Sequence, residues 1–169
     1  MSRCRALLLN VAVVLGLGIA SSGAVAGEPL DNATVSFGQW MSSPPLDRFP
    51  NFPGSPTTNV HELSPNVVTI KAGGSVNFII SGLHNIAIYD DGTQPGDINI
   101  AATIPATGVP PVPLIKDPDG RIYRGLDPTL QAVDRVEVVN FAEPGVYLVI
   151  CAVLPHFVEG MYGYVRVIP

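Results

Sequence analysis

The sequence has 169 residues, with 14 acidic residues against nine Lys and Arg, and its formal net charge is −5 at pH 7. An acidic chain offers no broad positive surface to phosphate backbones or anionic lipid, so nucleic acid and charged membrane are excluded as main partners. Hydrophobic residues make up 47% of the chain, which is enough to build the core of one domain.

The first 26 residues have the order of segments that is typical of a secretory signal peptide. Arg3 and Arg5 precede an apolar run over residues 6–20, and small residues then lead to Ala26. The run is shorter than the roughly 18–20 apolar residues of a membrane anchor. We therefore expect cleavage after Ala26, no membrane anchor after processing, and a periplasmic or otherwise extracytoplasmic protein.

Cleavage at this point changes both the charge and the cysteine content of the chain. Removing residues 1–26 from 169 leaves a single domain of 143 residues, 27–169, with seven Lys and Arg against 14 acids and a net charge of −7. Cys4 is lost with the leader, and Cys151 remains as a lone thiol. A lone thiol in an oxidising compartment makes no internal disulfide, so it must be buried or bound to metal.

Seven short runs rich in β-branched and aromatic residues, bounded by Gly, Pro, Asn and Asp, predict strands. They span residues 34–41, 67–71, 75–81, 85–90, 133–141, 145–153 and 161–168. Residues 71–75 and 143–145 are typical of turns between strands. No convincing amphipathic helix is found, so the fold class is all-β, a sandwich or barrel.

Two proline-rich segments interrupt the strand pattern, because proline removes a backbone donor from sheets and helices. Residues 42–58 are interpreted as a surface loop, and residues 91–130 as a long insertion between two core strands. A structureless loop of that length is unusual in a compact domain. We therefore expect the insertion to pack on the sheets, with short strand or turn pieces near 98–103 and 121–123.

The C-terminal part of the chain holds a possible metal-binding loop with the spacing Cys-x4-His-x4-Met, formed by Cys151, His156 and Met161. A strand delivers the cysteine, a short loop presents the histidine, and the methionine opens the next strand. His84, at the end of a separate strand, would be the fourth ligand. Thiolate and thioether favour Cu(I), imidazole serves both oxidation states, and a His2Cys set with a long axial Met is typical of blue-copper electron-transfer sites.

With these residues the chain resembles the cupredoxins, the family of plastocyanin, azurin and rusticyanin. The resemblance covers residues 58–90 and 133–169, and the ligand spacing is most similar to that of rusticyanin. It implies a Greek-key β-sandwich or barrel with one type 1 copper ion near one end. The long insertion at 91–130 and the loop at 42–58 depart from the simplest family pattern.

The same resemblance assigns roles to individual residues. It implies that His84, Cys151 and His156 are equatorial copper ligands and that Met161 is the axial ligand. It also implies that Asn85 supports the site from behind the ligands, by hydrogen bonding across the loops near Cys151.

The residues around His156 suggest a docking patch for redox partner proteins. Leu154, Pro155 and Phe157 are apolar, and the resemblance implies that electrons pass through the exposed imidazole edge among them. We expect a monomer. The remaining histidine, His61, lacks a partner at metal-binding spacing and is expected to face solvent from a strand.

The leading hypothesis is a one-electron carrier that cycles copper between Cu(II) and Cu(I), with no catalytic residues. One alternative is a copper storage or delivery protein, although such carriers usually have Met-rich or His-rich stretches. Another is an accessory copper subunit of a larger redox enzyme; copper oxidases and nitrite reductases add centres bound by extra histidines, and only His61 is left for that. Glu62 or Glu159 in place of Met161 would give a red-copper variant.

Overall fold

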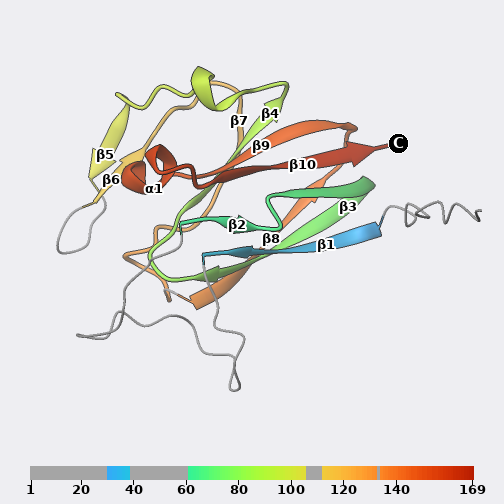
Figure 1. The fold of residues 1–169 in the computed structure, drawn as a ribbon, viewed down its shortest axis with the longest axis horizontal. Coiled ribbons are helices and arrows are strands. Elements are labelled where there is room, and N and C mark those ends of the chain that lie inside the picture. The colour runs from blue at the N-terminus through green and yellow to red at the C-terminus, as the bar shows by residue number, and fades with distance from the viewer. Residues whose placement is uncertain (1–29, 39–60, 106–111, 133) are drawn as a thin grey trace, which may run out of the picture.

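The computed structural model describes residues 30–38, 61–105, 112–132 and 134–169. The expected leader and the loop at 42–58 lie outside these residues. In Figure 1 the strands form two packed layers, one containing β9 and β10 and the other containing β1 and β8. The prediction of an all-β fold is confirmed. Within the described ranges, no helix is long and apolar enough to cross a membrane.

Most strands are short and end at or just before Gly, Pro or Asp, as their sequence indicates. In chain order the elements are β1 (Leu30–Phe37), β2 (Leu63–Ser64), β3 (Val67–Ser81), β4 (Ile86–Asp91), η1 (Pro95–Asp97), β5 (Thr103–Pro105), β6 (Pro113–Ile115), β7 (Arg121–Arg124), β8 (Asp134–Phe141), β9 (Gly145–Cys151), α1 (Leu154–Val158) and β10 (Tyr162–Ile168).

The long strand β3 belongs to both layers. Its first part, up to Lys71, pairs in parallel with β10, and β9, β4 and β7 follow in that sheet. Its second part, from Gly74, pairs in antiparallel with β8 and in parallel with β1. One continuous strand therefore joins the two layers at their edges and places the core between them.

The predicted turn at residues 71–75 is wrong, because β3 passes through this segment from one layer to the other. The strand continues through this segment and bends at two glycines. Gly73 has a φ of 84°, which side chains disfavour, and a Cβ on Gly74 would lie 2.8 Å from the carbonyl oxygen of Lys71. The glycines allow the bend without ending the strand.

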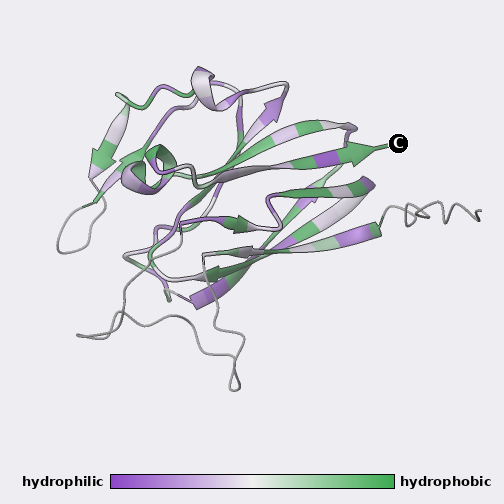
Figure 2. Ribbon diagram, viewed as in Figure 1, coloured by the Kyte–Doolittle hydropathy of each residue, from purple (hydrophilic) through white to green (hydrophobic). Residues whose placement is uncertain are grey.

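The core is divided between the interior of the sandwich and one outer face. The interior cluster includes Phe37, Ile70 and Phe78, all without exposed surface. A second cluster, around Tyr89 and Ile150, covers the outer face of β4 and β9 beneath α1 and β6. Figure 2 shows the resulting alternation of hydrophobic and hydrophilic residues along the strands.

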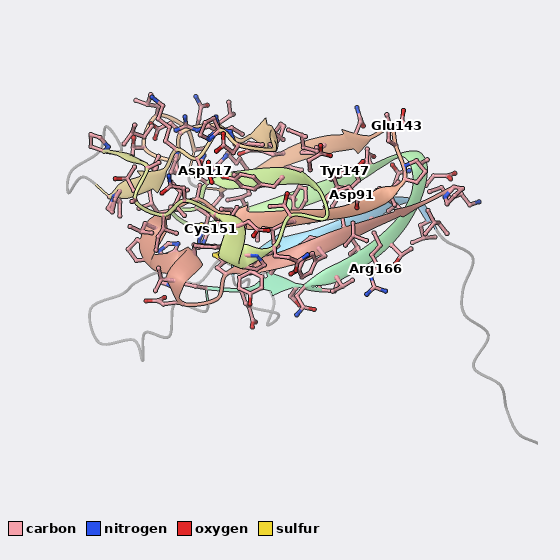
Figure 3. All side chains as sticks on the ribbon, turned by 90° about the horizontal axis from the view of Figure 1, so that it is seen from above. Asp91, Asp117, Glu143, Tyr147, Cys151 and Arg166 are labelled. Carbon is pink, nitrogen blue, oxygen red and sulfur yellow. The ribbon has the colours of Figure 1, made fainter. Side chains whose placement is uncertain are left out.

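The described part of the insertion at 91–130, residues 91–105 and 112–130, packs on the sandwich, as expected, and is organised around the buried side chain of Asp117 (labelled in Figure 3). Its carboxylate accepts hydrogen bonds from the backbone N–H groups of Asn99 and Asp119. The backbone carbonyl oxygen of Asp117 accepts hydrogen bonds from the hydroxyl of Tyr89 and the guanidinium of Arg121.

The short strand or turn pieces predicted inside the insertion are present. The piece expected at 121–123 is the strand β7. The piece expected at 98–103 consists of local turns as far as Ala102, and Thr103 begins β5. Backbone groups of that stretch bond within local turns or to the carboxylate of Asp117, so a ladder does not form there.

Candidate metal centre

The cysteine, the second histidine and the methionine lie on one tight loop between β9 and β10. Cys151 is the last residue of β9, His156 lies in the single-turn helix α1, and Met161 directly precedes β10. The N–H of Cys151 donates to the carbonyl of Met161 (2.9 Å), and the N–H of Met161 donates to the carbonyl of His156 (2.9 Å). These bonds close the loop on itself and fix the three residues relative to one another.

The first histidine comes from the link between β3 and β4, far from this loop in sequence. Antiparallel pairing of β4 with β9 sets Ile86 opposite Cys151, so His84 enters beside the end of β9. Phe37 packs edge-on against the His84 ring, with centroids 5.8 Å apart. Gly38 has a φ of 96°, and a Cβ there would lie 2.7 Å from His84 Nε2, so only glycine fits against the imidazole.

The three donor atoms form a compact triangle. The Nδ1 atoms of His84 and His156 lie 3.1 Å apart, and each lies 3.6 Å from the Sγ of Cys151. A point equidistant from the three atoms lies about 2.0 Å from each, close to the roughly 2.0–2.3 Å at which imidazole nitrogen and thiolate sulfur bind Zn²⁺, a first-row divalent ion. The residues present therefore fit a metal ion without rearrangement.

Met161 lies in the same buried environment. Its side chain has no exposed surface and belongs to the interior cluster that also contains Cys151. Figure 3 shows Cys151 at the end of the molecule that carries α1, while Glu143 and Arg166 lie toward the other end. All four residues of the predicted ligand set are thus placed at one pole of the sandwich.

Burial sets the protonation state of the metal-free site. It lowers the pKa of His84 to about 3, with repulsion from His156 and His61 adding to the effect. It lowers the pKa of His156 to about 4 in the same way, again with a contribution from His61. Both imidazoles are therefore neutral at pH 7, and their nitrogens are ready to bind metal.

The thiol of Cys151 responds to burial in the opposite sense. Burial raises its pKa to about 12, against hydrogen bonds from the backbone N–H groups of Asn85 and Val153 to the sulfur. The thiol is therefore protonated at pH 7 when no metal is bound, and a metal ion must displace that proton. The two N–H groups are already directed at the sulfur and stabilise the thiolate that results.

Asn85 bonds across the loops, on the side of the site that faces the insertion. Its side-chain amide donates to the carbonyl oxygens of Gly125 (3.1 Å) and Leu126 (2.8 Å), just after β7. The backbone carbonyl oxygen of Asn85 accepts a hydrogen bond from the N–H of Ala152 (2.6 Å), which follows Cys151 directly. Ile115, in β6, donates its N–H to the carbonyl of Ala152 (2.8 Å). The insertion therefore supports the residue that follows His84 and the residue that follows Cys151.

A buried ion pair behind His84 was missed in the sequence. Arg135 and Glu137 join at 2.7 Å, and their side chains are only 9% and 4% exposed. Arg135 also donates to the carbonyl oxygen of His84 (2.9 Å), and Tyr123 donates its hydroxyl to Glu137 (2.8 Å). On β8 the residues flanking Glu137, Val136 and Val138, are the exposed ones.

The alternation of residues along β8 was a usable signal for this pair. Val139 and Phe141 are core residues of β8, and positions 135 and 137 share their face because side chains alternate along a strand. Opposite charges two residues apart on a buried face satisfy each other, which lets the pair be buried.

The prediction for His61 is wrong. Its ring does not face solvent but stacks on the ring of His156, with centroids 3.7 Å apart and an interplanar angle of 22°. Its Nδ1 also pairs with the carboxylate of Glu159. The short strand β2 brings His61 to the site by pairing with β1. The sequence carried no spacing signal, only the fact that one of three histidines had no role.

The expected docking patch also needs a correction. Phe157 is 8% exposed and packs in the second cluster with Ile115 and Ile150, because α1 turns this side chain toward the sheet. Pro155 is exposed and Leu154 is partly exposed. Val158, which is 67% exposed, is the large apolar side chain that α1 presents outward.

The fold and the site together define a β-sandwich protein with a cysteine thiol and two imidazoles at one pole. A sequence profile of the copper-binding proteins of the plastocyanin/azurin family matches residues 57–168. The chain belongs to this family. It is therefore a copper-binding electron-transfer protein, and its cluster of His84, Cys151 and His156 with Met161 matches a type 1 copper site.

Comparison with solved structures finds similarity to an auracyanin, a pseudoazurin and a plastocyanin. A dithionite-reduced auracyanin from the photosynthetic bacterium Roseiflexus castenholzii has 21% identity and a TM-score of 0.50, over 84% of this chain and all of that chain. A pseudoazurin from Methylobacterium extorquens has 22% identity and a TM-score of 0.39, over 81% of this chain and 75% of that chain. Plastocyanin from Dryopteris crassirhizoma has 21% identity and a TM-score of 0.39, over 80% of this chain and 99% of that chain. Comparison with curated protein sequences gave no significant match.

Removing one partner of the buried ion pair should destabilise the protein strongly. Arg135→Met leaves the carboxylate of Glu137 buried without its partner, and we expect the free energy of unfolding to fall by about 3–5 kcal/mol. The double variant Arg135→Met/Glu137→Gln should lose less, because no unpaired charge remains. Urea denaturation of the metal-free proteins measures both losses, and equal losses would contradict this account.

Acid should destabilise the metal-free protein through the buried histidines. Their pKa values lie below the ordinary 6.5, so the unfolded chain binds more protons between about pH 3 and 6.5. Stability is therefore full well above pH 6.5, and by pH 4 up to about 3 kcal/mol should be lost for each histidine, less for His156 because solvent screens its partly exposed ring. The His84→Gln/His156→Gln variant, measured by urea denaturation at both pH values, should show a clearly shallower dependence. An identical dependence in the variant would refute this origin.

Proposed function

We propose that the protein is an exported one-electron carrier with a single type 1 copper centre. The observation that carries the proposal is the donor triangle of His84, Cys151 and His156, preformed at one pole of a rigid sandwich. The two Nδ1 atoms and the thiolate of Cys151 would hold the copper ion. The buried thioether of Met161 would complete the ligand set.

The chain's own residues are suited to a metal that changes charge without moving. When bound, copper supplies the Cu(II)/Cu(I) couple, and the thiolate and thioether favour the reduced form while the imidazoles serve both. The hydrogen bonds that join Cys151, His156 and Met161 hold the loop in one shape. Asn85 fastens the cysteine loop to the insertion. A site held in this way rearranges little between oxidation states.

Redox partners reach the copper, in this proposal, at the pole that carries α1. His156 is partly exposed there, beside Pro155 and Leu154. The outward side chain of Val158 extends this apolar surface, and Phe157 contributes only by supporting the helix from below. The protein acts as a monomer that presents this pole to its electron donor and acceptor in turn.

Export is the second part of the proposal, and its support is the order of basic, apolar and small residues over residues 1–26. The functional unit is then the single domain 27–169 with its insertion at 91–130. The intact mass of the protein recovered from the periplasm of a bacterial host should correspond to a chain that begins at Gly27. A mass that still includes residues 1–26, in a protein outside the cytoplasm, would contradict cleavage at Ala26.

The thiolate of Cys151 should give the copper protein its colour. Loaded with Cu(II), the protein should show an intense visible thiolate-to-copper absorption that disappears on reduction and returns on oxidation. Cys151→Ser should lose this band, because a hydroxyl does not replace the thiolate. Absorption and copper content are measured on the same samples, and a colourless wild-type protein with full copper loading would refute the proposal.

A further inference from the structure

His61 is the residue nearest the predicted ligands that the proposed function leaves without a role. Its ring lies almost parallel to that of His156, at 3.7 Å between centroids, and it meets the ring of His84 edge-on at 6.0 Å. Only 15% of its side chain is exposed. A third imidazole is thus layered on the outer side of the donor triangle.

Two fixed points keep His61 in this place. On the backbone side, the N–H of Gly38 donates to the carbonyl of Glu62 (3.1 Å), and β2 pairs with the end of β1. On the side-chain side, the Nδ1 of His61 pairs with the carboxylate of Glu159. Glu159 follows α1 directly, and its N–H donates to the carbonyl of Pro155 (3.0 Å). His61 therefore connects β2 to the helix that carries His156.

The same end of the molecule encloses both predicted histidine ligands. Phe37 and Gly38 lie against the His84 ring, and His61, reached through the bond from Gly38 to Glu62, lies against the His156 ring. His156 sits on a helix of a single turn, which offers it little support of its own. A ring stacked on it and fastened to Glu159 limits both its rotation and the access of water.

We propose that His61 is a positioning residue for the copper site, which stacks on His156, is held by Glu159, and keeps the His156 ring in its metal-binding orientation. This inference rests on the proposed function, since it takes His156 as a ligand. It adds a residue outside the ligand set whose loss leaves the donors in place but less firmly held.

Three variants separate the stack from the tether. His61→Ala removes both, His61→Phe keeps a ring on His156 without the bond to Glu159, and Glu159→Ala keeps the stack without the tether. Loss of the visible band in excess EDTA measures copper release. Residues that support a ligand typically change metal affinity about 10-fold or more, so His61→Ala should release copper about tenfold faster than wild type. His61→Phe should stay close to wild type, and Glu159→Ala should lie between them.

Two further readouts distinguish positioning from general loosening. The thermal midpoint of the metal-free His61→Ala protein should stay near that of wild type, while the NMR signals of the His156 ring in that protein should broaden or shift. His61→Phe should restore the His156 signals. If His61→Ala matches wild type in copper release and in the His156 signals, or if His61→Phe behaves as His61→Ala does, the proposal is wrong. A wild-type protein without the visible band would instead count against the proposed function itself.

Discussion

The metal centre depends on one register, the antiparallel pairing of β4 with β9 that sets Ile86 opposite Cys151. This pairing joins a histidine and a cysteine that are 67 residues apart in the chain. Because side chains alternate along a strand, a slip by one residue would turn Cys151 to the other face of the sheet and away from His84. Both faces of β4 and β9 are buried, so a slip would force the side chains of each face into the packing that fits the other face.

The insertion secures this register from the outside. It supplies the carbonyl oxygens of Gly125 and Leu126 to Asn85 and the N–H of Ile115 to Ala152, so it contacts the backbone next to each strand end. The ion pair of Arg135 and Glu137 adds a bond to the carbonyl of His84 from the other layer. A long proline-rich segment thereby becomes part of the support of the site, with its own fold fixed by Asp117.

Local spacing predicted that Cys151, His156 and Met161 lie on one loop between two strands, because they are joined by a few residues of chain. The position of His84 also followed, once the resemblance supplied the pairing of distant strands. His61 did not follow, because a two-residue strand and one bond from Gly38 bring it to the site, and neither leaves a pattern in the sequence. The burial of Phe157 depends on the turn of α1, which the expected loop did not contain.

The shared strand β3 also determines the order in which the molecule can be completed. Its first part pairs in parallel with β10, the last strand of the chain, and β10 in turn pairs with β9. Contacts between such distant segments form late in folding, because a long loop must first be closed. One sheet therefore stays open at β3 until β10 has paired with it. Until β10 has paired with β9, the loop that holds Cys151, His156 and Met161 is not closed, so the donor atoms come together only after this long-range pairing has formed.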